Sequence, residues 1–348
     1  MDKLDYTILK LIDQSSGRIS SAELAAQLKP CGFDLSERAV RYHVRDLETA
    51  GYVHPPVRRA RALTAKGAHE LCAASVSERI GCIMSKISNL AFLTGLSAET
   101  GQGTVVLNVC QLPEAQLPAA LGALHEVLDS PYALSNRVMV RRGGERLDGM
   151  CVPAGMAAIG TLCRVTLDGV LLKAGIPVTS RFGGTVEVRS GFARRFASFI
   201  GYATSSVSPL EAFARCGMTD IHRVLASGNG TVLGSLVEIP EICLGKARSL
   251  LAQLQRSGIA GSVVLGSPSQ PLLDMPVSAG KVGVAILCDL NPLAVLCEAG
   301  FDVQLHSMGA VVEYCALETS AATACAPHFG ARTAARFDVP QVRKQVTC

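Results

Sequence analysis

The hydrophobic positions in the first fifty residues recur at helical spacing, in three runs separated by polar residues. The first run, which ends before Gly17, consists of Leu4, Ile8, Leu11 and Ile12. A second helix is expected to begin at Ser20, because Ser20 and Glu23 have the spacing of a capping box. Ser36 can cap a third helix that ends near Ala50. The pattern predicts a small helical module at the N-terminus.

The third predicted helix has an apolar face and a basic face. At 100° per residue, Val40, Val44 and Leu47 fall on one side of this helix. The opposite side carries long polar side chains, those of Arg38, Arg41, Tyr42 and Arg45. We expect the apolar side to pack within the module and the basic side to face solvent.

A basic hairpin is predicted after this helix. Residues 52–53 form a short strand, two prolines make a turn, and residues 57–63 return as a second strand that carries Arg58, Arg59 and Arg61. Thr64 can cap a fourth helix. From Arg38 to Lys66 there are seven basic and two acidic residues, an excess of five positive charges, whereas the whole chain carries only +4. Positive charge is therefore concentrated in this module.

Three helices followed by a hairpin are typical of a winged helix-turn-helix domain, mostly α-helical with a β-wing, which we place at residues 1–75. In such a domain the third helix enters the major groove and the wing lies against phosphates. The expected DNA contacts are Arg38, Arg41, Tyr42, Arg45, Arg58, Arg59 and Arg61. The alternative is a solvated basic surface on a module that binds another protein.

The rest of the chain contains an internal repeat. Residues 101–106 (GQGTVV) resemble 228–233 (GNGTVL), and residues 112–114 (LPE) resemble 239–241 (IPE), both at an offset of 127. A helical stretch and an apolar strand follow each copy. We therefore predict a duplicated α/β regulatory domain over residues 76–320, with halves at about 101–219 and 228–302, and a loosely ordered tail at 321–348.

Later matches suggest that the two halves differ in length. Residues 176–178 (IPV) resemble 275–277 (MPV), and the segment from Pro209 resembles the one from Pro292 at an offset of only 83. This change of offset predicts two insertions in the first half, at 155–173 and 189–206. A crevice between two similar halves is a common ligand site.

Composition narrows the class of protein. The chain has 348 residues, of which 49% are hydrophobic and 18% charged, enough apolar residues for a large core. Its thirteen cysteines form no C-x-x-C pair and fit neither a zinc knuckle nor a thioredoxin-type motif. The longest uncharged stretch, 257–273, is interrupted by glycines and prolines and is too short to span a membrane. We expect a cytoplasmic protein with no membrane segment, metal or cofactor.

Several segments resemble the NrpR family of nitrogen-regulatory repressors. The longest are residues 76–93, VSERIGCIMSKISNLAFL, and residues 168–178, DGVLLKAGIPV. The resemblance covers most of residues 4–315 and includes three shorter segments: 158–163 (AIGTLC), 181–184 (RFGG) and 208–211 (SPLE).

This resemblance implies a homodimeric repressor that binds double-stranded DNA and releases its operator when the regulatory domain senses 2-oxoglutarate. A 2-oxo dicarboxylate needs cations or several N–H donors at both ends. Arg181 and the backbone of the two following glycines are suited to one carboxylate, and Lys173 is a second cation. The expected effector contacts are Thr161, Cys163, Lys173, Arg181, Gly183, Gly184 and Ser205.

Simpler structural roles are open for the same residues. Arg181 could pair with a neighbour such as Glu187, and the two glycines could form a bulge or a turn. Lys173 could be the solvated end of a strand, and Cys163 a small buried hydrophobe.

Two other functions also remain open. The chain could be an enzyme that acts in the crevice, or an RNA-binding regulator, since winged helices of this type also occur beside ribonucleases. No zinc-protease, serine-hydrolase, P-loop or dinucleotide motif occurs in a working context. We therefore expect a regulator without enzymatic activity.

Overall fold

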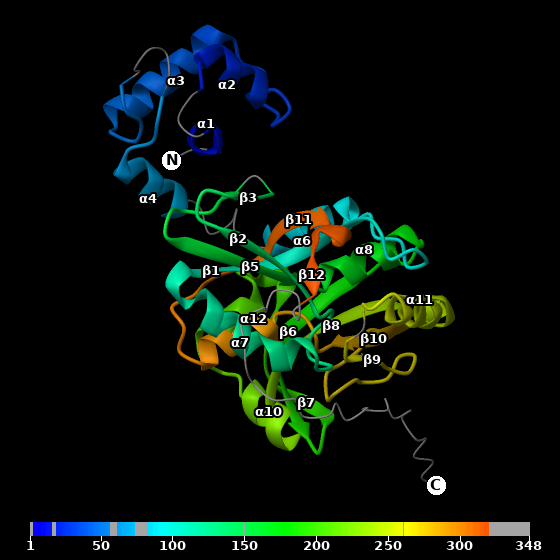
Figure 1. Ribbon diagram of the computed structural model, residues 1–348. Coiled ribbons are helices and arrows are strands. Elements are labelled where there is room, and N and C mark those ends of the chain that lie inside the picture. The colour runs from blue at the N-terminus through cyan, green and yellow to red at the C-terminus, as the bar shows by residue number, and fades with distance from the viewer. Residues whose placement is uncertain are drawn as a thin grey trace.

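The structure is a computed structural model that describes residues 3–15, 19–55, 61–73, 82–148, 150–259 and 261–319. The arginines predicted at the wing tip, Arg58 and Arg59, and the predicted tail at 321–348 lie outside these residues. Figure 1 shows a group of N-terminal helices above a larger body of sheets and helices.

The N-terminal module contains the four predicted helices, α1 (Lys3–Gln14), α2 (Ser21–Leu28), α3 (Glu37–Thr49) and α4 (Ala65–Ala73). The helix starts follow the capping signals: Ser20 and Glu23 form the full capping box before α2, and Ser36 Oγ accepts the Ala39 N–H before α3. Thr64 Oγ1 accepts the Gly67 N–H before α4. The module has its own hydrophobic core, made of Ile8, Leu9, Ile12, Ile19, Leu24, Leu28, Val40, Val44, Leu47 and Val53.

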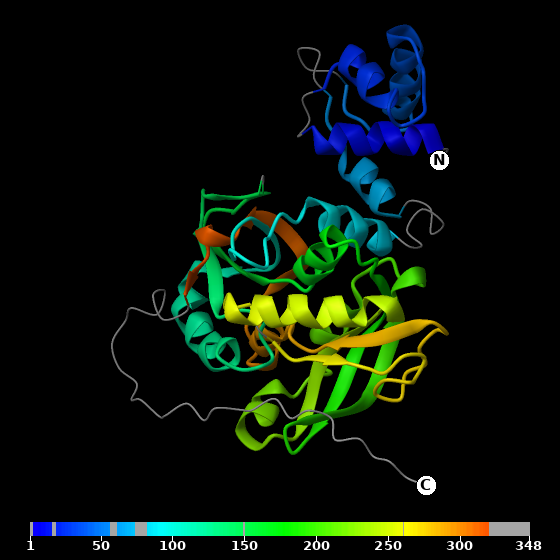
Figure 2. The same cartoon turned by 90° about the vertical axis from the view of Figure 1, so that its right-hand side faces the viewer.

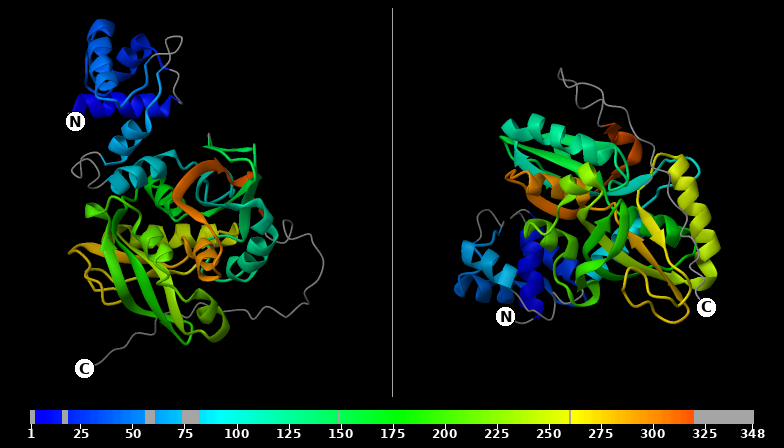
Figure 3. Two further views of the ribbon diagram at one scale, coloured as in Figure 1. Left: turned by 90° about the vertical axis from the view of Figure 1, so that its left-hand side faces the viewer. Right: turned by 90° about the horizontal axis from the view of Figure 1, so that it is seen from below.

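Two five-stranded antiparallel sheets form the larger body (Figure 3). The first has the order β11-β1-β5-β2-β12, with strands Gln304–Glu313, Thr104–Pro113, Met156–Leu162, Arg137–Arg142 and Glu318–Thr319. The second has the order β7-β6-β8-β10-β9, with strands Phe192–Gly201, Thr179–Arg189, Gly230–Pro240, Lys281–Ile286 and Val263–Leu265. A small hairpin joins β3 (Arg146–Leu147) and β4 (Met150–Cys151).

Helices pack on both sheets and fill the space around them. They are α6 (Cys82–Leu93), α7 (Leu117–Leu128), α8 (Val165–Lys173), α9 (Pro209–Arg215), α10 (Ile221–Ser227), α11 (Leu244–Arg256) and α12 (Asn291–Glu298). Helices α7 and α12 share one hydrophobic cluster with strands of both sheets. Figure 2 shows α11 across the face of the second sheet, where Leu254 joins a second cluster with β8 and β10.

The order of elements repeats along this body. The series β1-α7-β2-β5-α8-β6 is followed, after an interval, by β8-α11-β9-β10-α12-β11. The last strand of each series pairs with the first strand of the other, because β6 pairs with β8 and β11 pairs with β1. Each sheet therefore contains strands of both series, and neither series forms a complete sheet alone.

The structure corrects the predicted insertions. Residues 155–173 are not inserted, since they contain β5 and α8, the counterparts of β10 and α12. The segments 176–178 and 275–277 lie in different connections, one after α8 and one before β10. Short proline motifs occur in many loops, so this match did not reflect equivalent positions. The extra elements are the β3–β4 hairpin within the first series and, between residues 192 and 227, β7, α9 and α10, so the repeated series cover 104–189 and 230–313.

In each series, one polar side chain hydrogen-bonds a helix to the backbone of a strand: α8 to β1 in the first series, and α12 to β8 in the second. In the first series, Thr166 Oγ1 accepts the Val106 N–H at 3.0 Å. In the second, Asn291 Oδ1 accepts the Leu233 N–H at 2.8 Å, and its Nδ2 donates to the carbonyls of Leu233 and Leu287. Asn291 is fully buried, so these backbone groups have no access to water.

Replacing Asn291 is expected to destabilise the regulatory body. Asn291→Ala removes the side-chain partner of one buried N–H and two carbonyls, which costs roughly 1–3 kcal/mol in the free energy of unfolding. Chemical denaturation measures this decrease, and Asn89→Ala on the exposed side of α6 is the matched control. A change for Asn291→Ala no larger than that of the control would contradict the role given to this side chain.

Candidate functional site

The outer face of α3 is basic and exposed, as the sequence predicts. Arg38, Arg41, Tyr42 and Arg45 are exposed, whereas Val40, Val44 and Leu47 are buried in the module. Arg41 pairs with Glu37 one turn earlier. Within the described part of the chain, Arg38 and Arg45 have no acidic partner. Two guanidinium groups on this face are therefore available to an anionic partner such as a phosphate backbone.

Two other basic residues of the module have partners within it. Arg61 was expected to contact DNA, but its side chain is only 10% exposed and its Nε donates to Glu48 Oε1 at 3.1 Å. One terminal nitrogen of its guanidinium donates to Ser21 Oγ. Arg61 therefore links the wing to α2 and α3. Lys66 donates to the Ala50 carbonyl at the end of α3. Arg61 thus has a structural contact within the module, and its contact with DNA stays a prediction.

A small polar cavity lies where the two series of elements meet. Its walls come from α6, β1, the start of α8, the segment around α9 and the loop before α12, together with β11. The lining residues are Ile87, Asn108, Cys163, Arg164, Val165, Tyr202, Ser208, Asp289, Ser307 and Met308. The space between these residues is about the size of one water molecule.

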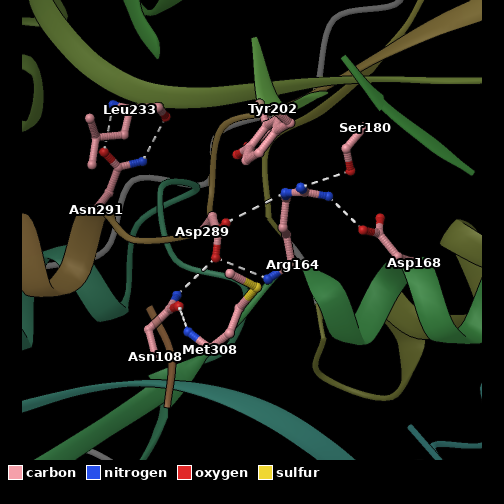
Figure 4. Close-up of polar contacts among 10 residues, drawn as sticks. Asn108, Arg164, Asp168, Ser180, Tyr202, Leu233, Asp289, Asn291 and Met308 are labelled. Carbon is pink, nitrogen blue, oxygen red and sulfur yellow. Dashed lines mark hydrogen bonds and ion pairs between the residues drawn. The ribbon is translucent and has the colours of Figure 1, made fainter. Parts of the chain in front are cut away.

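Arg164 is at the centre of the polar wall (Figure 4) and is 1% exposed. Its guanidinium donates to Asp168 Oδ2 at 2.5 Å and to Ser180 Oγ at 3.0 Å, and its Nε lies 3.7 Å from Asp289 Oδ2. The guanidinium also lies over the ring of Tyr202, 5.1 Å from its centroid. One buried cation is thus shared between two carboxylates from different series.

Asp289 connects this cation to the first sheet. Its Oδ1 accepts from the Arg164 backbone N–H at 3.0 Å and from Asn108 Nδ2 at 2.8 Å. Asn108 Oδ1 in turn accepts the Met308 N–H, at the point where the register of β1 and β11 shifts. The amide of Asn108 therefore substitutes for a strand hydrogen bond and holds Asp289 in place.

Burial changes the protonation behaviour of this region. Burial raises the pKa of Asp168, although Arg164 acts in the opposite direction. Burial also raises the pKa of the Tyr202 hydroxyl and places the pKa of the Cys163 thiol well above its usual value. Cys163 is therefore a neutral thiol that lines the cavity and not a nucleophile.

The predicted effector residues lie on several elements of the body. Cys163 lines the cavity, and Thr161 is buried on β5 with no hydrogen-bond partner for its hydroxyl among the described residues. Lys173 is exposed at the end of α8. Ser205 donates to the Val207 carbonyl in the turn that leads to α9. Of the seven predicted effector residues, Cys163 alone is among the residues that line this cavity.

Arg181 and the two glycines have structural roles. Arg181 Nε lies 3.5 Å from Glu238 Oε1, so the arginine does have an acidic partner, although it is not Glu187. Gly183 and Gly184 lie inside β6, which pairs on both sides, so their N–H groups do not form a free anion cradle.

The glycines are needed for close packing. A Cβ on Gly183 would lie 2.7 Å from the Tyr202 hydroxyl, and one on Gly184 would lie 2.0 Å from the Ser198 carbonyl oxygen. The register shifts of β6 occur at neighbouring positions and not at these glycines, so a bulge is also not their role.

Sequence reasoning missed Arg164, Asp289 and Asn108, which form most of the polar wall. A signal was present, since Leu162-Cys163-Arg164 and Leu287-Cys288-Asp289 are equivalent at an offset of 125. The two helices that follow end in Ala-Gly at the same offset. Arg164 of the first series and Asp289 of the second thus occupy equivalent positions, carry opposite charges and contact each other in the fold.

The described residues contain no group of side chains arranged to hold a metal ion. Among the same residues, no helix is long and apolar enough to cross a membrane.

Family models match both parts of the chain. Residues 80–319 match the family described as NrpR regulatory domains NRD1 and 2. Residues 6–71 match the ribonuclease R winged-helix domain, which agrees with the predicted N-terminal fold.

Curated relatives are named as nitrogen regulators. Global nitrogen regulator NrpRI of Methanosarcina mazei is 31% identical over 307 residues, which cover 88% of this chain and 94% of that protein. Global nitrogen regulators NrpR of Methanococcus maripaludis and Methanocaldococcus jannaschii are 26% and 27% identical over 87% and 90% of this chain. The matched regions cover 53% and 54% of those two proteins, so this chain spans about half their length.

A solved structure has the same fold over most of the body. The crystal structure of a nitrogen repressor-like protein from Methanococcus jannaschii aligns with a TM-score of 0.59 and 24% identity. The alignment covers 68% of this chain and 98% of that one.

Removing the central cation is expected to destabilise the protein in a pH-dependent way. Arg164→Met leaves two buried carboxylates without the cation that they share, and removal of one partner from a buried ion pair costs about 3–5 kcal/mol. The absence of Arg164 raises the pKa of Asp168 further above its unfolded value. The variant is therefore more stable at low pH, where Asp168 is protonated. Its free energy of unfolding decreases as pH rises through this raised pKa.

Denaturation of the variant at about pH 5 and about pH 7 measures this difference. Arg189→Met, which removes an exposed arginine beside Glu187, is the control and should show neither effect. An Arg164→Met defect that is equally large at both pH values would contradict this account of the carboxylates.

Proposed function

Because this chain belongs to the family of NrpR nitrogen regulators, we propose that it is a ligand-responsive transcriptional repressor that binds double-stranded DNA through its winged helix. The observation that carries the proposal is the exposed basic face of α3, opposite the residues that pack in the module. A helix of this kind can enter the major groove, where arginines reach phosphates and base edges. The proposal includes no catalytic step and places the protein in the cytoplasm with the DNA.

RNA binding is the second candidate function. It is favoured by the match of residues 6–71 to the winged-helix domain of ribonuclease R. Competition between duplex DNA from the upstream region of the protein's own gene and a duplex RNA of the same sequence separates the two functions. Preference for the RNA would support the alternative.

We propose that the repressor acts as a homodimer. One winged helix makes few base contacts, and two-fold pairing on half-sites one helical turn apart is the common way to increase them. A pair of modules also doubles the phosphate contacts, which dominate the affinity for DNA.

We propose a small dicarboxylate, with 2-oxoglutarate as the first ligand to test, as the effector that releases DNA. The cavity of Asn108, Arg164 and Ser307 is the supporting feature, because the hydroxyl of Ser307 is buried and has no partner among the described residues. To shift a population from 1:99 to 99:1, effector binding must differ between states by about 5.5 kcal/mol, about half of it at each site of a dimer. Binding in this cavity requires Arg164 to exchange part of its contact with Asp289 for the ligand.

The α3 arginines are expected to provide DNA affinity. Arg38→Ala/Arg45→Ala should weaken operator binding and lower the salt slope by about one for each phosphate that is no longer neutralised. A gel shift at several salt concentrations measures both quantities. Arg223→Ala/Arg248→Ala, two exposed positions in the regulatory body, removes the same charge as a control. Equal operator affinity in the two double variants would contradict the proposed interface.

The dimer is tested by sedimentation of the full chain. At micromolar concentration we expect a species of twice the 36.5 kDa mass of one chain. The same species should bind one two-fold symmetric operator. A monomer in solution that also binds DNA as a monomer would overturn the proposed two-fold arrangement.

The effector site is tested by calorimetry with 2-oxoglutarate on the full chain. Ser307→Ala removes the unpartnered hydroxyl from the cavity wall and should weaken binding about tenfold, since hydrogen bonds to charged groups contribute about 1.5 kcal/mol or more. Ser249→Ala, on the exposed side of α11, should bind as the wild type does. If Arg181→Ala abolishes binding while Ser307→Ala does not, the effector lies at β6 and the cavity assignment is wrong.

A further inference from the structure

Helix α6 is the first described element of the regulatory body after the DNA-binding module. Helix α4 of the module ends at Ala73 and α6 begins at Cys82, so only eight residues separate them. These residues lie outside the described part of the chain. Helix α6 is therefore the part of the described regulatory body that is nearest in sequence to the module.

The same helix forms part of the wall of the cavity. Ile87 of α6 lines it, and Ile83, Ile87 and Ala91 are buried in a hydrophobic cluster that contains Cys163 and Met308. On the rim, Lys86 Nζ donates to the Ser307 carbonyl at 3.0 Å. Since the cavity has room for about one water molecule, a metabolite larger than water can fit only if the walls around it move.

Helix α8 links the polar wall of the cavity to α6. Arg164 and Asp168 lie at its start, and the next residue, Gly169, faces α6. A Cβ on Gly169 would lie 2.4 Å from Thr94 Cβ and 2.6 Å from the Ala91 carbonyl oxygen. The close contact of the two helices thus depends on the absence of a side chain beside the ion network.

We propose that α6 is a movable lid that couples occupation of the cavity to the position of the winged helix. The inference rests on the proposed function, since it describes how the repressor would respond to its effector. A ligand in the cavity displaces Ile87 and the rest of α6, and the displaced helix no longer holds the two modules of a dimer at the spacing of the operator. The ligand then favours the state that does not bind the operator, as regulation requires.

The proposed movement of α6 can be tested without a ligand, by substitutions in α8 that push α6 away from it. Gly169→Ala and Gly169→Val place one and three carbon atoms where α6 now packs, so they should displace the lid to increasing extents. Gly122→Ala on α7 adds a Cβ in open space and is the matched control. Hydrogen exchange of the α6 amides reports the lid, and a gel shift with the full chain reports operator affinity.

We expect faster exchange in α6 and an operator affinity lower by roughly 5- to 150-fold, the usual range of allosteric coupling, with a larger effect for Val than for Ala. Sedimentation and the thermal midpoint show whether the variants remain folded dimers. Faster exchange in α6 with unchanged operator affinity would overturn the coupling. Unchanged exchange in both variants would overturn the lid. If the wild type itself does not bind the operator, the proposed function is wrong, which is a distinct result.

Discussion

The buried contact between Arg164 and Asp289 is the interaction on which the regulatory body depends. A guanidinium removed from water needs charged and hydrogen-bonding partners, and Arg164 has them in Asp168, Ser180, Asp289 and the ring of Tyr202. These partners come from α8, β6, the segment before α12, and the turn after β7. The position of one side chain therefore fixes how four parts of the chain meet.

The strand exchange between the two series makes this contact possible. Because β6 pairs with β8 and β11 pairs with β1, the start of α8 and the loop before α12 face each other across the junction of the sheets. Opposite charges at one equivalent position of a repeat can then neutralise each other. The cavity lies beside this pair, and α6 covers it, so charge, cavity and lid form one connected unit.

The sequence predicts the N-terminal module well because its signals are local. A cap at Ser20, Ser36 or Thr64 acts within one turn of its own helix, and the spacing of Val40, Val44 and Leu47 fixes which side of α3 is buried. The exception is Arg61. Its partner Glu48 is thirteen residues away, so helical spacing does not reveal that the charge of Arg61 is paired.

The regulatory site was harder to predict because its contacts are distant in sequence. Arg164 and Asp289 are 125 residues apart, and their pairing depends on the exchanged strands, which no local pattern encodes. Gly183 and Gly184 looked like an anion cradle because glycine exposes backbone N–H groups, yet tight packing against Tyr202 and β7 gives the same residues another use. The repeat at an offset of 125 was the one sequence feature that could have indicated the pair.

The DNA-binding face and the cavity lid should behave as parts of one coupled system. Hydrogen exchange of the full-length protein, with and without its operator, tests this claim most directly. Direct contact with DNA should protect α3, and coupling predicts that α6 is also protected, although the proposed DNA contacts are all in the winged helix. Protection confined to the winged helix, with exchange in α6 unchanged, would contradict it.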